Sequence, residues 1–119
     1  MKINGRDVSF LRTVMANCKI AEICPDGDIA NARMLFEGNY QDSQRTAAKF
    51  MAIMSEGYEQ SKRFREAGYE PHPLTEEEAL NMTEDDFSEA FGEAIKAYTG
   101  EKPTVETEAP KGKKKQAKE

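Results

Sequence analysis

The chain has 119 residues, of which 38% are hydrophobic and 33% charged, and its formal net charge is −5. This length fits one domain with a modest hydrophobic core. An acidic balance argues against binding to the phosphate backbone of a nucleic acid. No apolar run is long enough to span a bilayer, and the first ten residues lack the apolar segment of a signal peptide. We therefore expect a cytosolic protein that binds neither nucleic acid nor membrane.

The charge is distributed unevenly along the chain. Residues 1–100 hold 18 Asp and Glu against 11 Lys and Arg, whereas residues 101–119 hold six Lys and four Glu. The second segment also has two prolines and almost no apolar side chains, so it cannot bury enough surface to offset the entropy of ordering. The sequence thus predicts a helical domain over 1–100 and a disordered Lys/Glu/Pro tail over 101–119.

The N-terminal part predicts a hairpin followed by a helix. Asn4-Gly5 is a strong hairpin turn, but its flanking segments are very short, so whether the hairpin forms stays open. The spacing of apolar residues predicts a helix over Phe10–Ile23, which Cys24-Pro25 ends. Its apolar face is formed by Leu11, Val14, Met15, Cys18 and Ala21, widened by Ile20 and Ile23.

A short helix over Ile29–Phe36 should follow, with Asp28 as N-cap. The longest and most regular amphipathic stretch is Gln41–Arg65, which predicts the central helix of the fold, capped by Asn39 or Asp42. Its apolar stripe comprises Ala47, Phe50, Met51, Met54, Tyr58, Ser61 and Phe64.

Two helix starts lie close together after the proline-containing connector over residues 69–73. Thr75 and Thr83 are each followed three residues later by an acid, Glu78 and Asp86, which is the capping-box pattern. The last helix ends at Gly100 and has its apolar face at Phe87, Ala90, Phe91, Ala94, Ile95 and Tyr98. The fold class is therefore mainly all-α, a small domain of about four to five helices.

No catalytic or metal site can be assembled from these residues. His72 is the single histidine and lies between two prolines, so no nucleophile has a convincing base. The segment Asp26–Glu37 departs from the calcium-loop pattern at the fifth and sixth positions. Cys18 and Cys24 are spaced for neither zinc nor a redox motif, and we expect two reduced thiols, with Cys18 in the core. We expect no enzyme and no cofactor.

The methionine and aromatic stripe of the central helix has two interpretations. A stripe of this kind usually packs a helical bundle. Part of it could instead stay open to a partner, since methionine adapts to varied apolar surfaces. The candidate partner-binding residues are Phe50, Met51, Met54, Tyr58, Phe87 and Phe91.

The order of segments resembles the tail assembly chaperones of long-tailed bacteriophages, in particular those of phages and prophages of Gram-positive bacteria. The likeness rests on FLRTVMANCKIAEICPDGD, GNYQDSQRTAAKFMAIMSEGYE, PLTEEEALNMTEDDFSEAFGEAIKAY and the PTVETEAPKGKKK tail, in that order. It covers nearly the whole chain but contains no single diagnostic motif.

The resemblance implies a small helical protein of the host cytoplasm that is absent from the finished virion. Such proteins keep the tape measure protein soluble while tail tube subunits polymerise around it, so both are the expected partners, and self-association stays open. Many are made in two forms through a programmed frameshift. The segment Gly112-Lys113-Lys114-Lys115 can be encoded by an A-rich slippery run, a hypothesis that the gene sequence tests.

Two other functions compete with the chaperone interpretation. A small adaptor or DNA-binding regulator would use residues 28–38 and the central helix as a helix-turn-helix, which the acidic body disfavours. A structural component of the virion is the third alternative.

Overall fold

The computed structural model describes residues 1–100, and the predicted tail at 101–119 lies outside the described residues. The described part is mainly helical, with a small N-terminal hairpin, as the sequence predicts. Its elements are β1 (Lys2–Ile3), β2 (Arg6–Asp7), α1 (Val14–Ile23), η1 (Pro25–Gly27), η2 (Ile29–Phe36), α2 (Tyr40–Arg65), α3 (Glu76–Leu80) and α4 (Glu84–Thr99), of which η1 and η2 are 3-10 helices.

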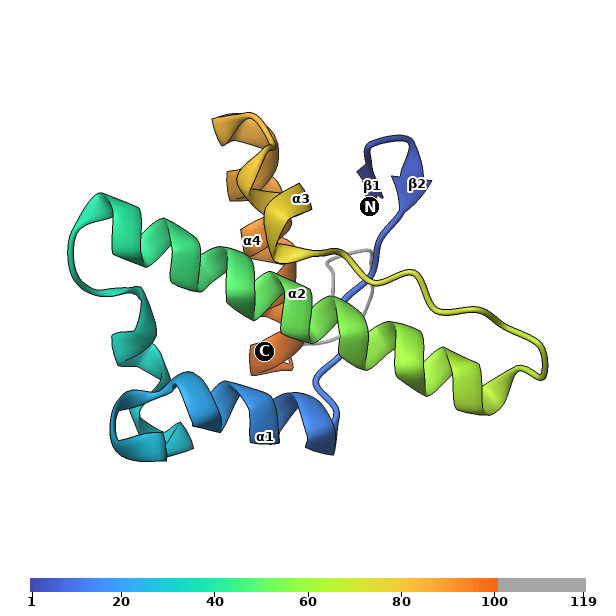
Figure 1. The fold of residues 1–119 in the computed structure, drawn as a ribbon, viewed down its shortest axis with the longest axis horizontal. Helices are drawn as coiled ribbons and strands as arrows, with labels where there is room; N and C mark the ends of the chain where they lie inside the picture. The colour runs from blue at the N-terminus through green and yellow to red at the C-terminus, as the bar shows by residue number, and fades with distance from the viewer. Residues whose placement is uncertain (101–119) are drawn as a thin grey trace, which may run out of the picture.

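Helix α2 is the axis of the fold, and the other elements pack around it. The Asn39 side chain accepts a hydrogen bond from the backbone N–H of Asp42 (2.8 Å), which fixes where the helix begins. In Figure 1, α1 and η2 lie below α2 and α3 lies above it, while α4 passes behind α2 and reaches η2 through the Phe36 and Phe91 rings. The prediction of a central helix is confirmed, with its start one residue earlier.

The hairpin forms and is held by contacts with the connector and α3. Asn4 and Gly5 have φ angles of 54° and 82°, which the two central residues of a tight hairpin turn require. Asn4 and Arg6 both donate to the carboxylate of Glu78, and Arg6 also donates to the carbonyl of His72. A hairpin with two-residue strands is too unstable to form by itself, and these tertiary contacts supply the missing stability.

Helix α1 begins four residues later than predicted. Its N-cap is Thr13, whose hydroxyl accepts from the backbone N–H of Ala16 (3.0 Å). Ahead of it the chain is extended, and the backbone N–H of Leu11 donates to the Met54 carbonyl of α2 (3.0 Å). This bond holds the segment against α2 in an extended form, so the tertiary contact overrides the apolar periodicity.

The segment Ile29–Phe36 is helical but adopts the 3-10 form. Asp28 caps it as predicted, because its carboxylate accepts from the backbone N–H of Ala30 (2.9 Å). A helix-turn-helix needs two α-helices, so the DNA-binding alternative gains no support from this segment.

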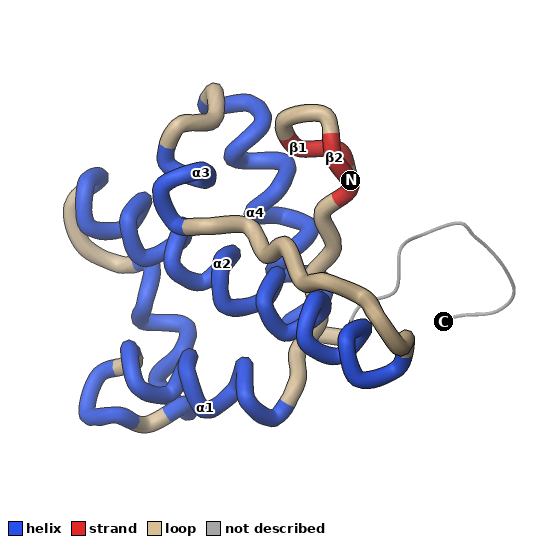
Figure 2. The backbone as a smooth tube through the Cα atoms, turned by 45° about the vertical axis from the view of Figure 1, so that its right-hand side comes forward, coloured by secondary structure: helices blue, strands red, loops and turns tan. Residues whose placement is uncertain are grey.

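The remaining caps are confirmed. Thr75 and Thr83 accept from the backbone N–H groups of Glu78 and Asp86, and Gly100 closes α4 with a left-handed φ of 82°. The connector between α2 and α3 runs back along α2 (Figure 2). Its position is fixed by two α2 side chains: Ser55 accepts from the Leu74 N–H, and Glu59 accepts from the His72 N–H and the Tyr69 hydroxyl.

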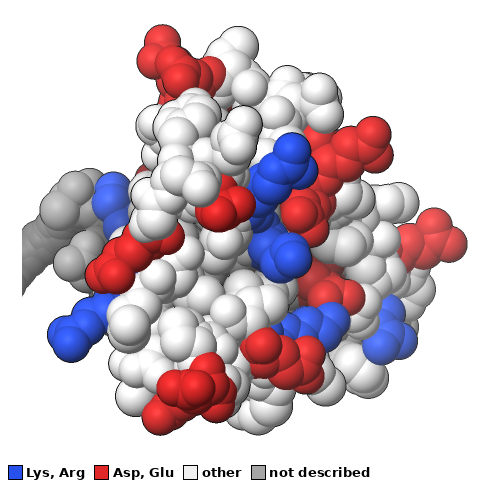
Figure 3. All heavy atoms as spheres, turned by 60° about the vertical axis from the view of Figure 1, so that its left-hand side comes forward, with Lys and Arg blue, Asp and Glu red and all other residues white. Residues whose placement is uncertain are grey.

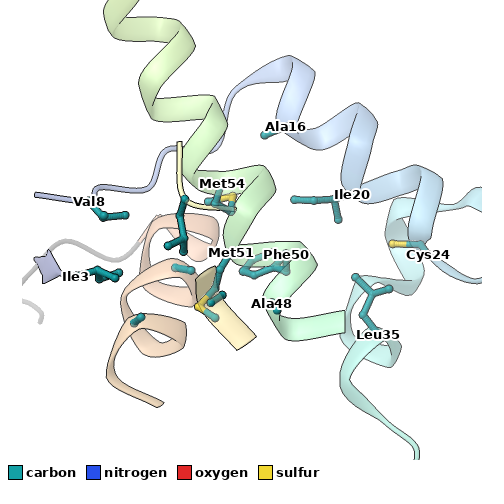
Figure 4. Packing of buried hydrophobic residues seen from close by; sticks show 14 residues of the cluster. Ile3, Val8, Ala16, Ile20, Cys24, Leu35, Ala48, Phe50, Met51 and Met54 are labelled. Carbon is teal, nitrogen blue, oxygen red and sulfur yellow. The ribbon is translucent and has the colours of Figure 1, made fainter. Parts of the chain in front are cut away.

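The core lies where α2 faces its neighbours. Phe50 and Ile20 meet between α2 and α1, and Met51 extends toward α4 (Figure 4). An aromatic cluster continues it, with ring centroids of Phe36 and Phe91 5.0 Å apart and those of Phe50 and Tyr98 5.5 Å apart. The buried apolar residues are Ile3, Val8, Ala16, Ile20, Cys24, Leu35, Ala47, Ala48, Phe50, Met51, Met54, Leu74, Ala79, Ala90 and Ala94.

Candidate functional site

Three of the six predicted partner-binding residues belong to the core. Phe50 is 2% exposed, and Met51 and Met54 are fully buried. They touch the helices on both sides of α2, so no partner reaches them in this conformation (Figure 4). Their assignment as a free surface is corrected: they are what packs the bundle together.

The other three predicted residues are half-buried and do not form one surface. Phe91 belongs to the aromatic cluster with Phe36 and Phe50. Phe87 lines a hollow between the starts of α2 and α4, whereas Tyr58 lies one turn beyond the buried Met54. Phe87 and Phe91 nevertheless pack against the same core cluster as Phe50, Met51 and Met54, so the structure brings five of the six together as core and leaves Tyr58 outside that cluster.

Several exposed apolar side chains lie around the start of α1 and at the end of α2, while Met34, Tyr40 and Leu80 are exposed elsewhere. Val14 is 80% exposed, Met15 63% and Phe64 79%, with Leu11 at 38%. The sequence pattern placed these residues on the apolar, core-facing sides of two helices. In the structure they are exposed, so the prediction is wrong at these positions. Cys18 is exposed on α1 as well, which corrects its placement in the core, while Cys24 is buried.

The close approach at Gly57 explains this orientation of α1. A Cβ at Gly57 would lie 2.4 Å from the Leu11 carbonyl oxygen and 3.5 Å from the Cβ of Ala16. Only a small side chain fits on α1 at this crossing, so Ala16 faces α2 and Ile20 follows one turn later. The larger Val14 and Met15 are thereby turned outward.

A groove runs between the two helices at this place. We call it the α1–α2 groove; it has a volume of about 330 Å³ and is the candidate functional site. Its floor is made by Ala16 and Gly57, and Met15 and Phe64 border it. The lining residues are Thr13, Met15, Ala16, Lys19, Ile53, Glu56, Gly57, Gln60, Arg63 and Phe64.

The charged side chains that line the groove give it a net positive charge. Lys19 and Glu56 form an ion pair across it and neutralise each other. The Arg63 guanidinium lies 4.3 Å from the centroid of the Phe64 ring, and its Nε donates to Gln60 (2.8 Å). Because Arg63 takes part in none of the four ion pairs found in residues 1–100, its positive charge is not offset there.

A second and larger hollow lies between the starts of α2 and α4. It has a volume of about 580 Å³ and is lined by Tyr40, Gln41, Gln44, Arg45, Leu80, Met82, Glu84, Asp85, Phe87 and Ser88. The Tyr40 hydroxyl donates to Glu84 (2.9 Å), and this bond raises the pKa of the tyrosine. Since its mouth is more polar and acidic, we rank it below the α1–α2 groove as an apolar binding site.

Viewed from the side where α2 begins, charged groups of both signs surround uncharged surface (Figure 3).

Neither a metal-ligand cluster nor a membrane-spanning helix is found in the described residues. Within residues 1–100, no three His, Cys, Asp or Glu side chains come together in a way that could hold a metal ion. No helix in the same range is long and apolar enough to cross a membrane. The residues that line the groove offer apolar and charge contacts to a partner.

Comparisons with protein families, with curated proteins and with solved structures find no match to this chain.

The sequence did carry one indication of the groove that periodicity missed. The apolar positions of residues 10–23 cover more than one helix face, with Val14 and Met15 on one side and Ile20 on another. When a helix has apolar residues on two faces, a neighbouring element covers one face and the other stays exposed.

Proposed function

We propose that this protein is a tail assembly chaperone of a long-tailed phage, which covers apolar helical segments of the tape measure protein in the host cytoplasm. The supporting observation is the exposed apolar surface of Val14, Met15 and Phe64 beside the α1–α2 groove. Contiguous exposed apolar surface marks interaction sites in soluble proteins. The resemblance of segment order supplies the identity of the partner.

The size of this surface suits a chaperone that must release its client. Full burial of one such side chain contributes about 1.5–3 kcal/mol. Association itself costs about 4–15 kcal/mol in lost freedom and ordering. Three or four side chains thus give a weak, readily exchanged contact, which tail tube subunits could displace as they polymerise.

The experiment is co-expression with the tape measure protein of the same phage. We expect the wild-type chain to keep that protein in the soluble fraction and a Met15→Ser/Phe64→Ser double variant to do so far less. Leu80→Ser is the matched control, because Leu80 is 37% exposed but borders the other hollow. Both variants should fold, since the substituted side chains are exposed.

Two results separate the function from the site. A tape measure protein that stays insoluble with the wild-type chain would contradict the chaperone function. If the tape measure protein stays soluble with the double variant, the chaperone function stands but the groove is not the binding site. A salt-dependent gel shift with duplex DNA would favour the regulator instead, and the protein in purified particles would favour a virion component.

A further inference from the structure

We infer that the α1–α2 groove selects an amphipathic helix whose apolar stripe is flanked by carboxylates. This rests on the proposed function and adds which part of a partner is recognised. Three observations support it: both walls of the groove are helices, the groove has a defined length along α2, and the positive charge of Arg63 is not offset by an ion pair.

The walls favour a helical occupant over an extended one. Both sides of the groove are α-helices, whose backbone hydrogen bonds are made within the helix. An extended segment would find no free N–H or C=O groups to pair with and would leave its own unsatisfied. A helix brings its backbone bonds with it and needs only side-chain contacts, as in other helix-in-groove complexes.

The length matches a short helical segment. From Ile53 to Phe64 the α2 wall spans 11 residues, or about 16 Å at 1.5 Å per residue. About three turns of a partner helix fit along it, presenting apolar residues at positions i, i+3 or i+4, and i+7. Ile53 and Phe64 would contact the two ends of that stripe, with Met15 on the facing α1 wall.

The charge decides what flanks the stripe. Arg63 stands at the border beside Phe64 and lines the groove. Carboxylates on a bound helix would meet its guanidinium, whereas lysines would be repelled. The acidic residues Glu84 and Asp85 give the second hollow the opposite preference.

The test uses two synthetic helical peptides with the same Leu/Met stripe, one flanked by Glu and the other by Lys. Fluorescence anisotropy with the full chain should give tighter binding of the Glu-flanked peptide by about fivefold or more. This preference should shrink as salt is raised, because the charges are exposed. Arg63→Glu should weaken the Glu-flanked peptide by about five- to tenfold and improve the Lys-flanked one.

Arg45→Glu is the matched control, since it makes the same charge reversal in the second hollow. It should leave both affinities unchanged. Equal affinity for the two peptides, or a larger effect of Arg45→Glu than of Arg63→Glu, would overturn the inference. So would binding of neither peptide, whereas the co-expression experiment tests the chaperone function independently.

Two other occupants are distinguished by the same variants. If the wild-type chain forms oligomers that Phe64→Ser dissociates, measured by light scattering on a sizing column, a second copy occupies the groove and the inference fails. It fails too if duplex DNA displaces the Glu-flanked peptide. A monomer that binds the Glu-flanked peptide and no DNA bears it out.

Discussion

Gly57 has a role at the scale of a single residue that no other residue can fill. It lies inside α2, where glycine costs about 1 kcal/mol relative to alanine. The extended chain before α1 crosses α2 at this point, with the Leu11 N–H bonded to the Met54 carbonyl. The missing side chain is what lets the two backbones come so close.

We predict that Gly57→Ala destabilises the protein by about 2 kcal/mol or more, because the clash with the Leu11 carbonyl outweighs the gain in helix propensity. Thermal unfolding followed by circular dichroism measures this. Gly92→Ala in α4 is the control: its Cβ would meet nothing within 4 Å, so it should be neutral or stabilising. A wild-type melting temperature for Gly57→Ala would contradict the proposed contact.

Tyr69 is a second residue with a measurable property. Its hydrogen bond to Glu59, together with burial and nearby negative charges, raises its pKa from 10.0 to about 12. The neutral phenol is the form that the fold favours. The stability it contributes is fully present below pH 10 and is lost as the pH rises through about 12.

An ultraviolet titration of phenolate should therefore show one tyrosine ionising near pH 12, and that step should be missing in Tyr69→Phe. Stability measured between pH 10 and 12 should fall more steeply in the wild type than in the variant. If the two chains titrate alike in this window, the bond between Tyr69 and Glu59 does not form in solution.

At the scale of elements, the hairpin and α3 depend on each other. Glu78 accepts from Asn4 and Arg6, and the Arg6–Glu78 ion pair has a distance of 2.7 Å. Burial acts to raise the Glu78 pKa, but these hydrogen bonds and the Arg6 charge outweigh it and lower the pKa. This carboxylate therefore contributes stability above its unfolded pKa and loses it as the pH falls through the lower folded value.

Glu78→Gln should release the hairpin while leaving α2 in place, with a loss of about 1 kcal/mol, since the pair is partly exposed. Amide hydrogen exchange should rise at residues 2–7 and change little in α2. The same pattern should appear in the wild type as the pH is lowered past the Glu78 pKa. Protection at residues 2–7 that is unaffected by the variant would show that other contacts hold the hairpin.

At the scale of the whole molecule, exposed apolar side chains lie near both ends of α2. Met15 and Phe64 lie beside Arg63 at the α1–α2 groove, whereas Tyr40 and Leu80 lie at the hollow near the start of α2. The acids of the first turns of α3 and α4 lie toward the start of α2. Both proposals place the partner at the α1–α2 groove, where Arg63 adds a positive charge to an otherwise apolar surface.

The sequence by itself determined the helices, their caps and the hairpin turn, because these depend on neighbours a few residues apart. Asn39, Thr75, Thr83 and Gly100 mark helix ends by local hydrogen bonding or a left-handed backbone. The spacing of Phe50, Met51 and Met54 placed them on one helix face, but only the structure showed that this face is buried.

Only the tertiary structure decided which apolar residues stay exposed. Periodicity locates an apolar face, but it cannot say which of two faces a neighbour covers. The crossing at Gly57 set the rotation of α1, buried Ala16 and Ile20, and left Val14 and Met15 outside with Phe64. The candidate site thus depends on a contact between residues 11 and 57, a separation that local sequence patterns do not reach.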